Sequence, residues 1–135
     1  MNDETGAGYY IQKTYKEVDQ YLERIKDAVA QGNYKISERE DKNLPFIRQF
    51  NVNRSRAAKM ILSLCPEDFL HAVPSKMEGN EGQELFVFCR RHALYRLMSS
   101  RSEEVLVYYK FDLVGDSFAV VVSMHEAERD PEYAF

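Results

Sequence analysis

A tyrosine, a lysine and a histidine fall on one face of a predicted β-hairpin near the C-terminus. Residues 105–126, VLVYYKFDLVGDSFAVVVSMHE, have the pattern of two strands joined at Gly115-Asp116. Glycine at the first loop position is typical of a two-residue type II′ turn, because it tolerates a positive φ. The register set by that turn puts Tyr108, Lys110 and His125 on the same side of the sheet, with Tyr108 diagonal to His125.

The same register makes the other face of the hairpin apolar throughout. Its cross-strand pairs are Leu113 with Phe118, Phe111 with Val120, Tyr109 with Val122, and Val107 with Met124. A period of two in apolar residues is the signature of a strand with one buried face. We therefore expect the hairpin to pack on a core through this face and to present the polar face as a working surface.

The polar residues suit the cleavage of RNA, in which the 2′-OH attacks the adjacent phosphate and no enzyme nucleophile is needed. The protein must supply a base, an acid and cations that stabilise the phosphorane. His125 can act as base or acid near neutral pH, and His71 is its candidate complement. Tyr108 can position or protonate, and three cations can hold phosphate. The expected catalytic residues are Tyr108, His125 and His71, and the expected substrate-binding residues are Lys110, Arg90 and Arg91.

Several other classes of chemistry have no support in the sequence. It contains no P-loop, no dinucleotide-binding glycine motif, no H-E-x-x-H and no C-x-x-C. The three histidines have no mutual spacing typical of a metal site, and Cys65 and Cys89 are expected to be free, largely buried thiols. We predict neither a metal nor a cofactor.

Length and composition are those of one soluble domain. The chain has 135 residues and a net charge of −4, with 44% hydrophobic residues. Basic residues nevertheless outnumber acidic ones over residues 35–62 and 85–110, so a local surface can bind phosphate, although solvated helix faces explain the same charges. No segment is long and apolar enough for a bilayer, and no signal peptide is recognisable. These features predict a cytoplasmic protein that does not associate with membranes.

The first half of the chain has helical patterns. Thr14 can cap a helix that ends before Gly32, and Asn53 can cap another over residues 54–64. A further short helix is predicted over CPEDFLHAV, which contains His71, and Ser37 with Glu40 predicts a helical turn. Their apolar positions recur every three or four residues.

The second half has strand patterns. LFVFCRR is a predicted buried strand, HALYRLMSSRSEE is assigned to a short helix, and the hairpin follows. The sequence thus predicts an α+β fold in which N-terminal helices pack on a small, three-stranded antiparallel sheet that ends in a C-terminal hairpin. The predicted organisation is a disordered tail over 1–13, a single domain over 14–126 and a flexible acidic tail over 127–135.

Three segments between about Tyr21 and Glu126 resemble the motility quorum-sensing regulator (MqsR) family of toxins. They are YLERIKDAVAQGNYKIS, KMILSLCPEDFLHAV and the hairpin. Members of that family are small bacterial messenger-RNA interferases with a RelE-like fold, each encoded beside an antitoxin. The resemblance therefore implies a toxin endoribonuclease of a type II toxin–antitoxin system, with single-stranded mRNA and a cognate antitoxin as partners.

The resemblance also assigns roles to individual residues. The family's catalytic tyrosine falls on Tyr108, and two of its lysines fall on His71 and His125. Its catalytic glutamine has no match within the predicted strand, and Gln83 lies just before it. The histidines in place of lysines, and the acidic net charge, leave two other interpretations open. One is a non-catalytic RNA- or protein-binding module with the same fold, and the other is a protein-interaction adaptor that uses its acidic tails.

Overall fold

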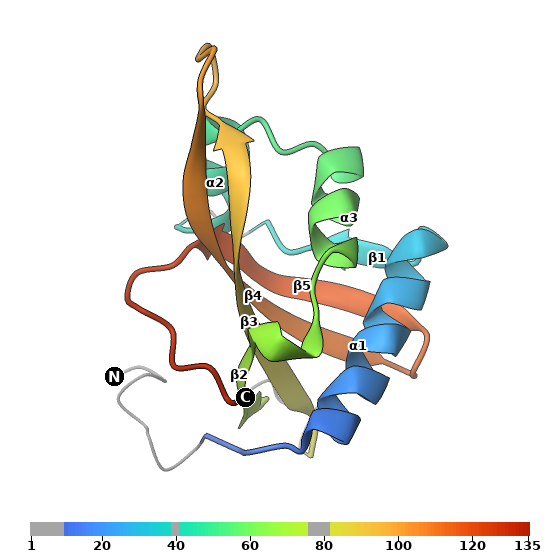
Figure 1. Ribbon diagram of the computed structural model, residues 1–135. Coiled ribbons are helices and arrows are strands. Elements are labelled where there is room, and N and C mark those ends of the chain that lie inside the picture. Colours follow the sequence, from blue (N-terminus) through green and yellow to red (C-terminus); the bar gives the residue numbers. More distant parts are fainter. Residues whose placement is uncertain (1–9, 39–40, 76–81) are drawn as a thin grey trace.

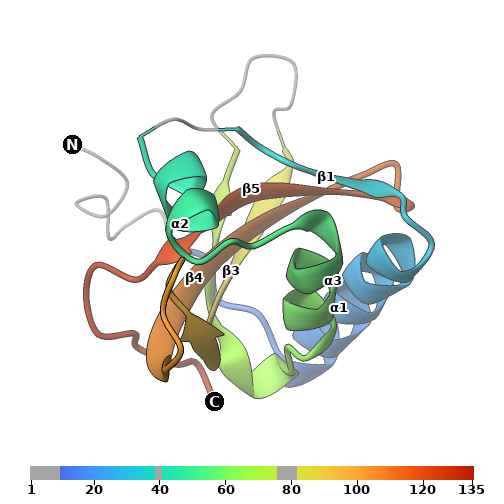
Figure 2. The same ribbon diagram turned by 90° about the horizontal axis from the view of Figure 1, so that it is seen from above.

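The protein is an α+β domain built on one mixed sheet of five strands. The computed structural model describes residues 10–38, 41–75 and 82–135. The sheet order is β1-β5-β4-β3-β2, with β1 parallel to β5 and all other neighbours antiparallel. Two helices, α1 and α3, cover one face, and α2 lies beside the edge of β5 (Figures 1 and 2). The predicted α+β class is confirmed, while the predicted three-stranded antiparallel sheet is wrong.

The N-terminal helices begin where the sequence predicts. Helix α1 (Tyr15–Ala30) has a capping box in which Thr14 Oγ1 accepts from the Glu17 amide at 3.1 Å, and Gly32 follows its end with φ +80°. Helix α3 (Arg54–Leu62) is capped by Asn53. Both helices bury their apolar stripes in one core with the sheet, as the spacing predicts.

Two predicted helices are strands instead. CPEDFLHAV forms a short 3-10 turn, η3 (Pro66–Asp68), followed by β2 (Phe69–Pro74), so His71 lies on a strand. HALYR continues β3 (Glu84–Tyr95), which turns back directly into β4 (Ser102–Val114). Pairing with β3 and β4 outweighs helix propensity at these two places, because a strand partner is available along the whole length.

The link after α1 is a strand that extends the sheet. β1 (Tyr34–Ile36) pairs with β5 (Phe118–Glu126), and the Ser37 amide donates to the Val121 carbonyl at 2.9 Å. Ser37 thus continues the strand where a helical turn was predicted, and its partner Glu40 lies outside the described residues. The next helix is α2 (Asn43–Gln49). None of the helices in the described part of the chain is long and apolar enough to cross a bilayer.

The register of the C-terminal hairpin differs from the predicted one by two residues. The loop has three residues, because Val114 pairs with Phe118, and Asp116 as well as Gly115 has a positive φ. The longer loop shifts the register by one residue, and a β-bulge at Val122 shifts it by a second one. Tyr108 is therefore directly opposite His125, where the sequence predicted a diagonal neighbour.

Asn43 holds this bulge from the edge of β5. Its side chain is fully buried, Nδ2 donates to the carbonyls of Val122 (3.1 Å) and Ser37 (2.9 Å), and Oδ1 accepts from the Met124 amide (3.0 Å). These groups lie beyond the end of β1, where none of the described residues continues as a strand beside β5. One amide side chain thus satisfies backbone groups that a bulge would leave unpaired in the interior.

Replacing Asn43 by alanine is expected to destabilise the fold by about 2–4 kcal/mol, because buried carbonyl and amide groups lose their partners. Urea unfolding followed by circular dichroism measures this cost. Asn33→Ala, at an exposed asparagine, is the matched control and should unfold within about 0.5 kcal/mol of the parent. Equal midpoints for the two variants would contradict the role assigned to Asn43.

Candidate functional site

Tyr108 and His125 form the centre of the polar face of the sheet. They are direct cross-strand partners on β4 and β5, and their rings stack with centroids 5.1 Å apart and an interplanar angle of 20°. His125 is only 8% exposed, and its Nδ1 lies 3.0 Å from the Glu126 carbonyl oxygen. Because a carbonyl only accepts, this contact makes Nδ1 the donor, so in the neutral ring Nε2 carries the lone pair. The two side chains are in contact, as predicted, but the register that brings them together differs from the predicted one.

Lys110 and His71 lie on the same face as Tyr108 and His125. They belong to the neighbouring row of cross-strand pairs, two residues along each strand. Val87 on β3 is the partner of both, which puts His71, Val87 and Lys110 in line across three strands. Tyr10 stacks on the His71 ring at 3.8 Å with planes 9° apart. Burial, together with the positive charge of Lys110, lowers the pKa of His71 to about 4, so the ring is neutral at pH 7.

His71 is too far from His125 to exchange protons on the same phosphate. The two residues sit on β2 and β5, which are separated by β3 and β4. Neighbouring strands are about 4.8 Å apart, so three spacings separate the backbones by about 14 Å. The predicted acid–base partnership of the two histidines therefore does not fit this geometry. Tyr108 is in ring contact with His125 and can exchange a proton.

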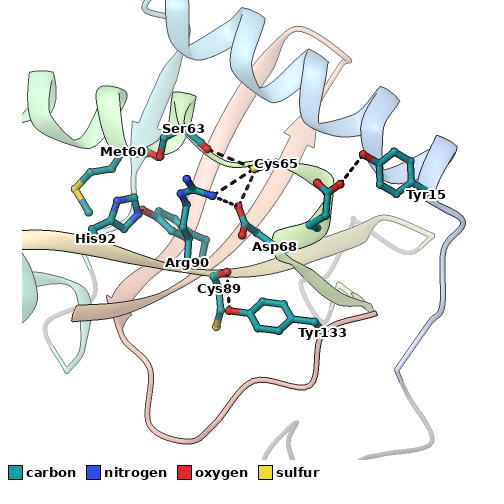
Figure 3. A network of polar contacts seen from close by, with 11 residues as sticks. Tyr15, Met60, Ser63, Cys65, Asp68, Cys89, Arg90, His92 and Tyr133 are labelled. Carbon is teal, nitrogen blue, oxygen red and sulfur yellow. Dashed lines mark hydrogen bonds and ion pairs between the residues drawn. The ribbon is translucent and has the colours of Figure 1, made fainter. Parts of the chain in front are cut away.

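Arg90 lies on the opposite face of the sheet from Tyr108. Its guanidinium contacts Asp68 Oδ2 at 3.1 Å and Cys65 Sγ at 3.3 Å, beneath α3 (Figure 3). Asp68 Oδ2 also accepts from the Cys65 amide, so this carboxylate ties η3 to β3. The expectation that Arg90 holds substrate phosphate beside Tyr108 is thus wrong, because successive residues of a strand face opposite sides.

Arg91, the neighbour of Arg90, does belong to the polar face. It is exposed and pairs with Leu106, two positions along from the pairing of Cys89 with Tyr108, so its side chain is on the same face as theirs. Cys89 itself is buried, and burial raises the pKa of its thiol to about 12, so it remains protonated. Both cysteines are free, with Cys65 only half-buried.

Gln83 is engaged in structure at the far end of the sheet. Its Nε2 donates to Asp112 Oδ1 at 2.8 Å and to the Leu113 carbonyl at 3.2 Å. Asp112 is buried, and its carboxylate accepts this hydrogen bond from the Gln83 side chain. Because Gln83 bonds to two neighbouring residues of β4, we infer that its role is to hold that strand in place.

The two chain ends contribute aromatic residues that the sequence analysis missed. Tyr10 stacks on His71, and Ile11 bridges to Ala72 beside β2; of the predicted disordered tail, residues 1–9 lie outside the described residues. At the C-terminus, Tyr133 donates to the Cys89 carbonyl at 3.3 Å (Figure 3), and the Phe135 ring stacks on Phe69. The sequence contains a signal for this packing, because both polar ends of the chain include aromatic residues.

The C-terminal segment borders the polar face. The Ala127 amide donates to the Leu106 carbonyl on β4, and the Ala134 amide donates to the Phe69 carbonyl on β2. Between them, Glu128 pairs with Lys42 at 3.1 Å. The segment therefore runs from the β5 side of the sheet to the β2 side, and it brings carboxylates close to the candidate site.

Comparisons with protein-family models, with curated proteins and with solved structures found no match to this chain. In the described ranges, no cluster of three or more His, Cys, Asp or Glu side chains could hold a metal ion. The site that the geometry offers is thus a stacked tyrosine–histidine pair with a lysine, a second histidine and an arginine on the same face.

Two half-buried histidines, His71 and His92, make the fold sensitive to acid. Burial is the main cause that lowers the pKa of both His71 and His92 to about 4, against about 6.5 in an unfolded chain. Between pH 6.5 and pH 4 the unfolded chain binds more protons, so the free energy of unfolding should fall as the pH falls through this window. Urea denaturation at pH 7.5, 6 and 5 measures the slope.

Replacing either histidine by glutamine removes one titrating group. His71→Gln and His92→Gln should each flatten the dependence of unfolding free energy on pH between 6.5 and 4. A slope that stays unchanged in both variants would mean that neither ring is held neutral by the fold.

Proposed function

We propose that this protein is a metal-independent endoribonuclease that cleaves single-stranded mRNA in the bacterial cytoplasm, as the toxin of a type II toxin–antitoxin pair. The observation that carries the proposal is the contact of Tyr108 with His125 on the same face as Lys110. These are the groups that transesterification of RNA requires: a base, an acid and a cation. The resemblance of three segments to the MqsR family, with its RelE-like fold, supports the same assignment.

In the proposed reaction the ribose 2′ oxygen forms a bond to the adjacent phosphorus, and the bond from phosphorus to the 5′ oxygen breaks. His125 Nε2 takes the proton of the 2′-OH, and the Tyr108 hydroxyl donates a proton to the departing 5′ oxygen. Lys110 stabilises the charge on the phosphorane oxygens. The products are a 2′,3′-cyclic phosphate and a 5′-OH, and the two proton transfers balance once solvent restores the side chains.

His71 takes a binding role in this proposal. Its neutral ring, stacked on Tyr10 and in line with Lys110, suits contact with a base or phosphate next to the scissile one. Nucleobases stack on aromatic rings regardless of sequence, which fits a surface that must accept a flexible single strand. Arg91 on the same face supplies a further phosphate contact.

The separation of His71 from His125 favours a second candidate, a non-catalytic RNA-binding module. With only one histidine beside Tyr108, the same face still has a stacking pair and cations for single-stranded RNA. Such a module binds RNA with a salt dependence and leaves it intact. The assay below separates the two candidates.

Purified protein should shorten a single-stranded RNA in EDTA and leave 2′,3′-cyclic phosphate ends, which mass spectrometry detects. His125→Ala and Tyr108→Phe should each lower the rate by about 100-fold or more, because each removes a proton-transfer group. His71→Gln should mainly raise the RNA concentration needed for half-maximal rate.

His92→Gln is the matched control, since His92 contacts Tyr109 Oη on the helix-covered side of the sheet and should leave cleavage unchanged in a folded variant. Parent-like cleavage by His125→Ala would refute the mechanism. RNA binding without cleavage by the parent would establish the binding module. Expression of the protein alone should slow growth of the host, and co-expression of a cognate antitoxin should restore it.

A further inference from the structure

The segment that follows β5 crosses the sheet from one side to the other. We call residues 127–135 the strap. It begins at the β5 side of β4, where the Ala127 amide donates to the Leu106 carbonyl at 2.8 Å, and it reaches β2, where the Ala134 amide donates to the Phe69 carbonyl at 3.0 Å. Because β3 lies between β4 and β2, the strap passes across β4 and β3 on one face of the sheet.

Tyr133 shows on which face the strap runs. Its hydroxyl donates to the Cys89 carbonyl at 3.3 Å, and in Figure 3 its ring and the Cys89 sulfur lie on the side of β3 away from Arg90. Cys89 pairs directly with Tyr108, and directly opposed residues of antiparallel strands share a face. The strap therefore runs over the face that presents Tyr108 and His125.

Side chains next to the strap are shielded, although α1 and α3 cover the other face. Cys89 is 1% exposed and His125 is 8% exposed. His125 Nδ1 contacts the carbonyl of Glu126, the residue directly before the strap. A general base must come within hydrogen-bond distance of the 2′-OH whose proton it takes. This side of the face therefore has to open before RNA can reach the proposed base.

The strap is acidic, and one of its carboxylates lies beside the site. Residues 128–132, ERDPE, have three carboxylates and one guanidinium. The hydrogen bond from Lys42, at 3.1 Å, lowers the pKa of Glu128, and the positive charge of His125 adds to this effect. Carboxylates repel RNA phosphates, and Glu128 also occupies an ammonium group of the kind that binds phosphate.

The strap is anchored through few contacts. None of its residues belongs to a helix or a strand. The Phe135 ring packs against Phe69 and Tyr15, with centroids 6.1 and 5.3 Å apart, yet it remains 47% exposed. Segments with few buried contacts open locally while the rest of the protein stays folded. The strap can thus detach without unfolding of the sheet.

We propose that the strap is an autoinhibitory element, which in its bound position keeps RNA phosphates away from the Tyr108–His125 pair and admits them when it detaches. The inference rests on the proposed function, because the surface that it covers is the proposed RNA site. RNA binds only the open state, so its apparent affinity is reduced by the fraction of molecules that are open.

Binding of an uncleavable RNA tests whether the strap excludes phosphate. Every 2′ oxygen of 2′-O-methyl RNA is blocked, so fluorescence anisotropy measures affinity without cleavage. The strap variant combines Glu128→Gln, Asp130→Asn and Glu132→Gln. A control variant removes the same charge from exposed positions of α1 and combines Asp19→Asn, Glu23→Gln and Asp27→Asn.

The strap variant should bind this RNA about 10-fold more tightly than the parent, and the control variant should stay within about 2-fold of the parent. Equal tightening in both variants would overturn the proposal, because net charge alone would explain it. Unchanged or weaker binding by the strap variant would overturn it as well, since the strap would then be neutral or part of the RNA site.

Alkylation of Cys89 measures detachment of the strap without RNA. A shielded thiol reacts with iodoacetamide only through the open state. Tyr133→Phe removes the hydroxyl that binds the Cys89 carbonyl, and Tyr95→Phe is the matched control at an exposed tyrosine. Mass spectrometry should find Cys89 alkylated about 5-fold faster in Tyr133→Phe, the factor expected for one hydrogen bond, and at the parent rate in Tyr95→Phe.

An unchanged rate at Cys89 in Tyr133→Phe would overturn the anchoring of the strap. An equal acceleration at Cys65, which contacts Arg90 on the other face, would also overturn it, because the whole fold would then have loosened. Circular dichroism establishes that each variant is folded.

The strap and the nuclease can fail separately. If the parent cleaves RNA and the strap variant binds 2′-O-methyl RNA no better, the nuclease stands and the strap is refuted. If no RNA is cleaved but the strap variant binds more tightly than its control, the strap stands as the cover of a non-catalytic RNA surface. Absence of RNA binding in parent and strap variant alike would refute both.

Discussion

The structure depends on the way Asn43 completes the edge of β5. Beyond the end of β1 the strand bulges at Val122, and one buried amide side chain takes the place of a neighbouring strand. The bulge shifts the rest of β5 by one residue relative to β4. Without that shift His125 would not stand opposite Tyr108, so a buried hydrogen-bonding constraint on one edge sets the geometry of the candidate site.

The sheet separates two kinds of polar chemistry on its two faces. On the helix side, Arg90, Asp68 and Cys65 form a half-buried network that ties η3 to β3. On the other side, Tyr108 and His125 lie on a face that is bordered by the C-terminal segment, and Tyr10 stacks on His71 at the β2 end of that face. Alternation along each strand enforces this separation, so adjacent arginines have unrelated roles, one in the fold and the other on the candidate surface.

Long strands give the molecule a second surface of interest. β3 and β4 are longer than β2 and β5, and the surplus length, residues 91–106, becomes an arm that is anchored to α2. Within the described residues, no strand pairs with the arm beyond β3 and β4 themselves. The arm and the polar face share β3 and β4, and Arg91 belongs to both.

The sequence by itself determined the capped helices α1 and α3, the hairpin, and the shared face of Tyr108, Lys110 and His125, because caps and apolar periods are local signals. Only the tertiary structure decided the rest. His71 lies on a strand because β3 is there to pair with it, and it is three strands from His125 because of the sheet order. The loop length and the bulge set the hairpin register, and the bulge depends on Asn43, which is far from it in the chain. Such long-range pairings leave no trace in local spacing.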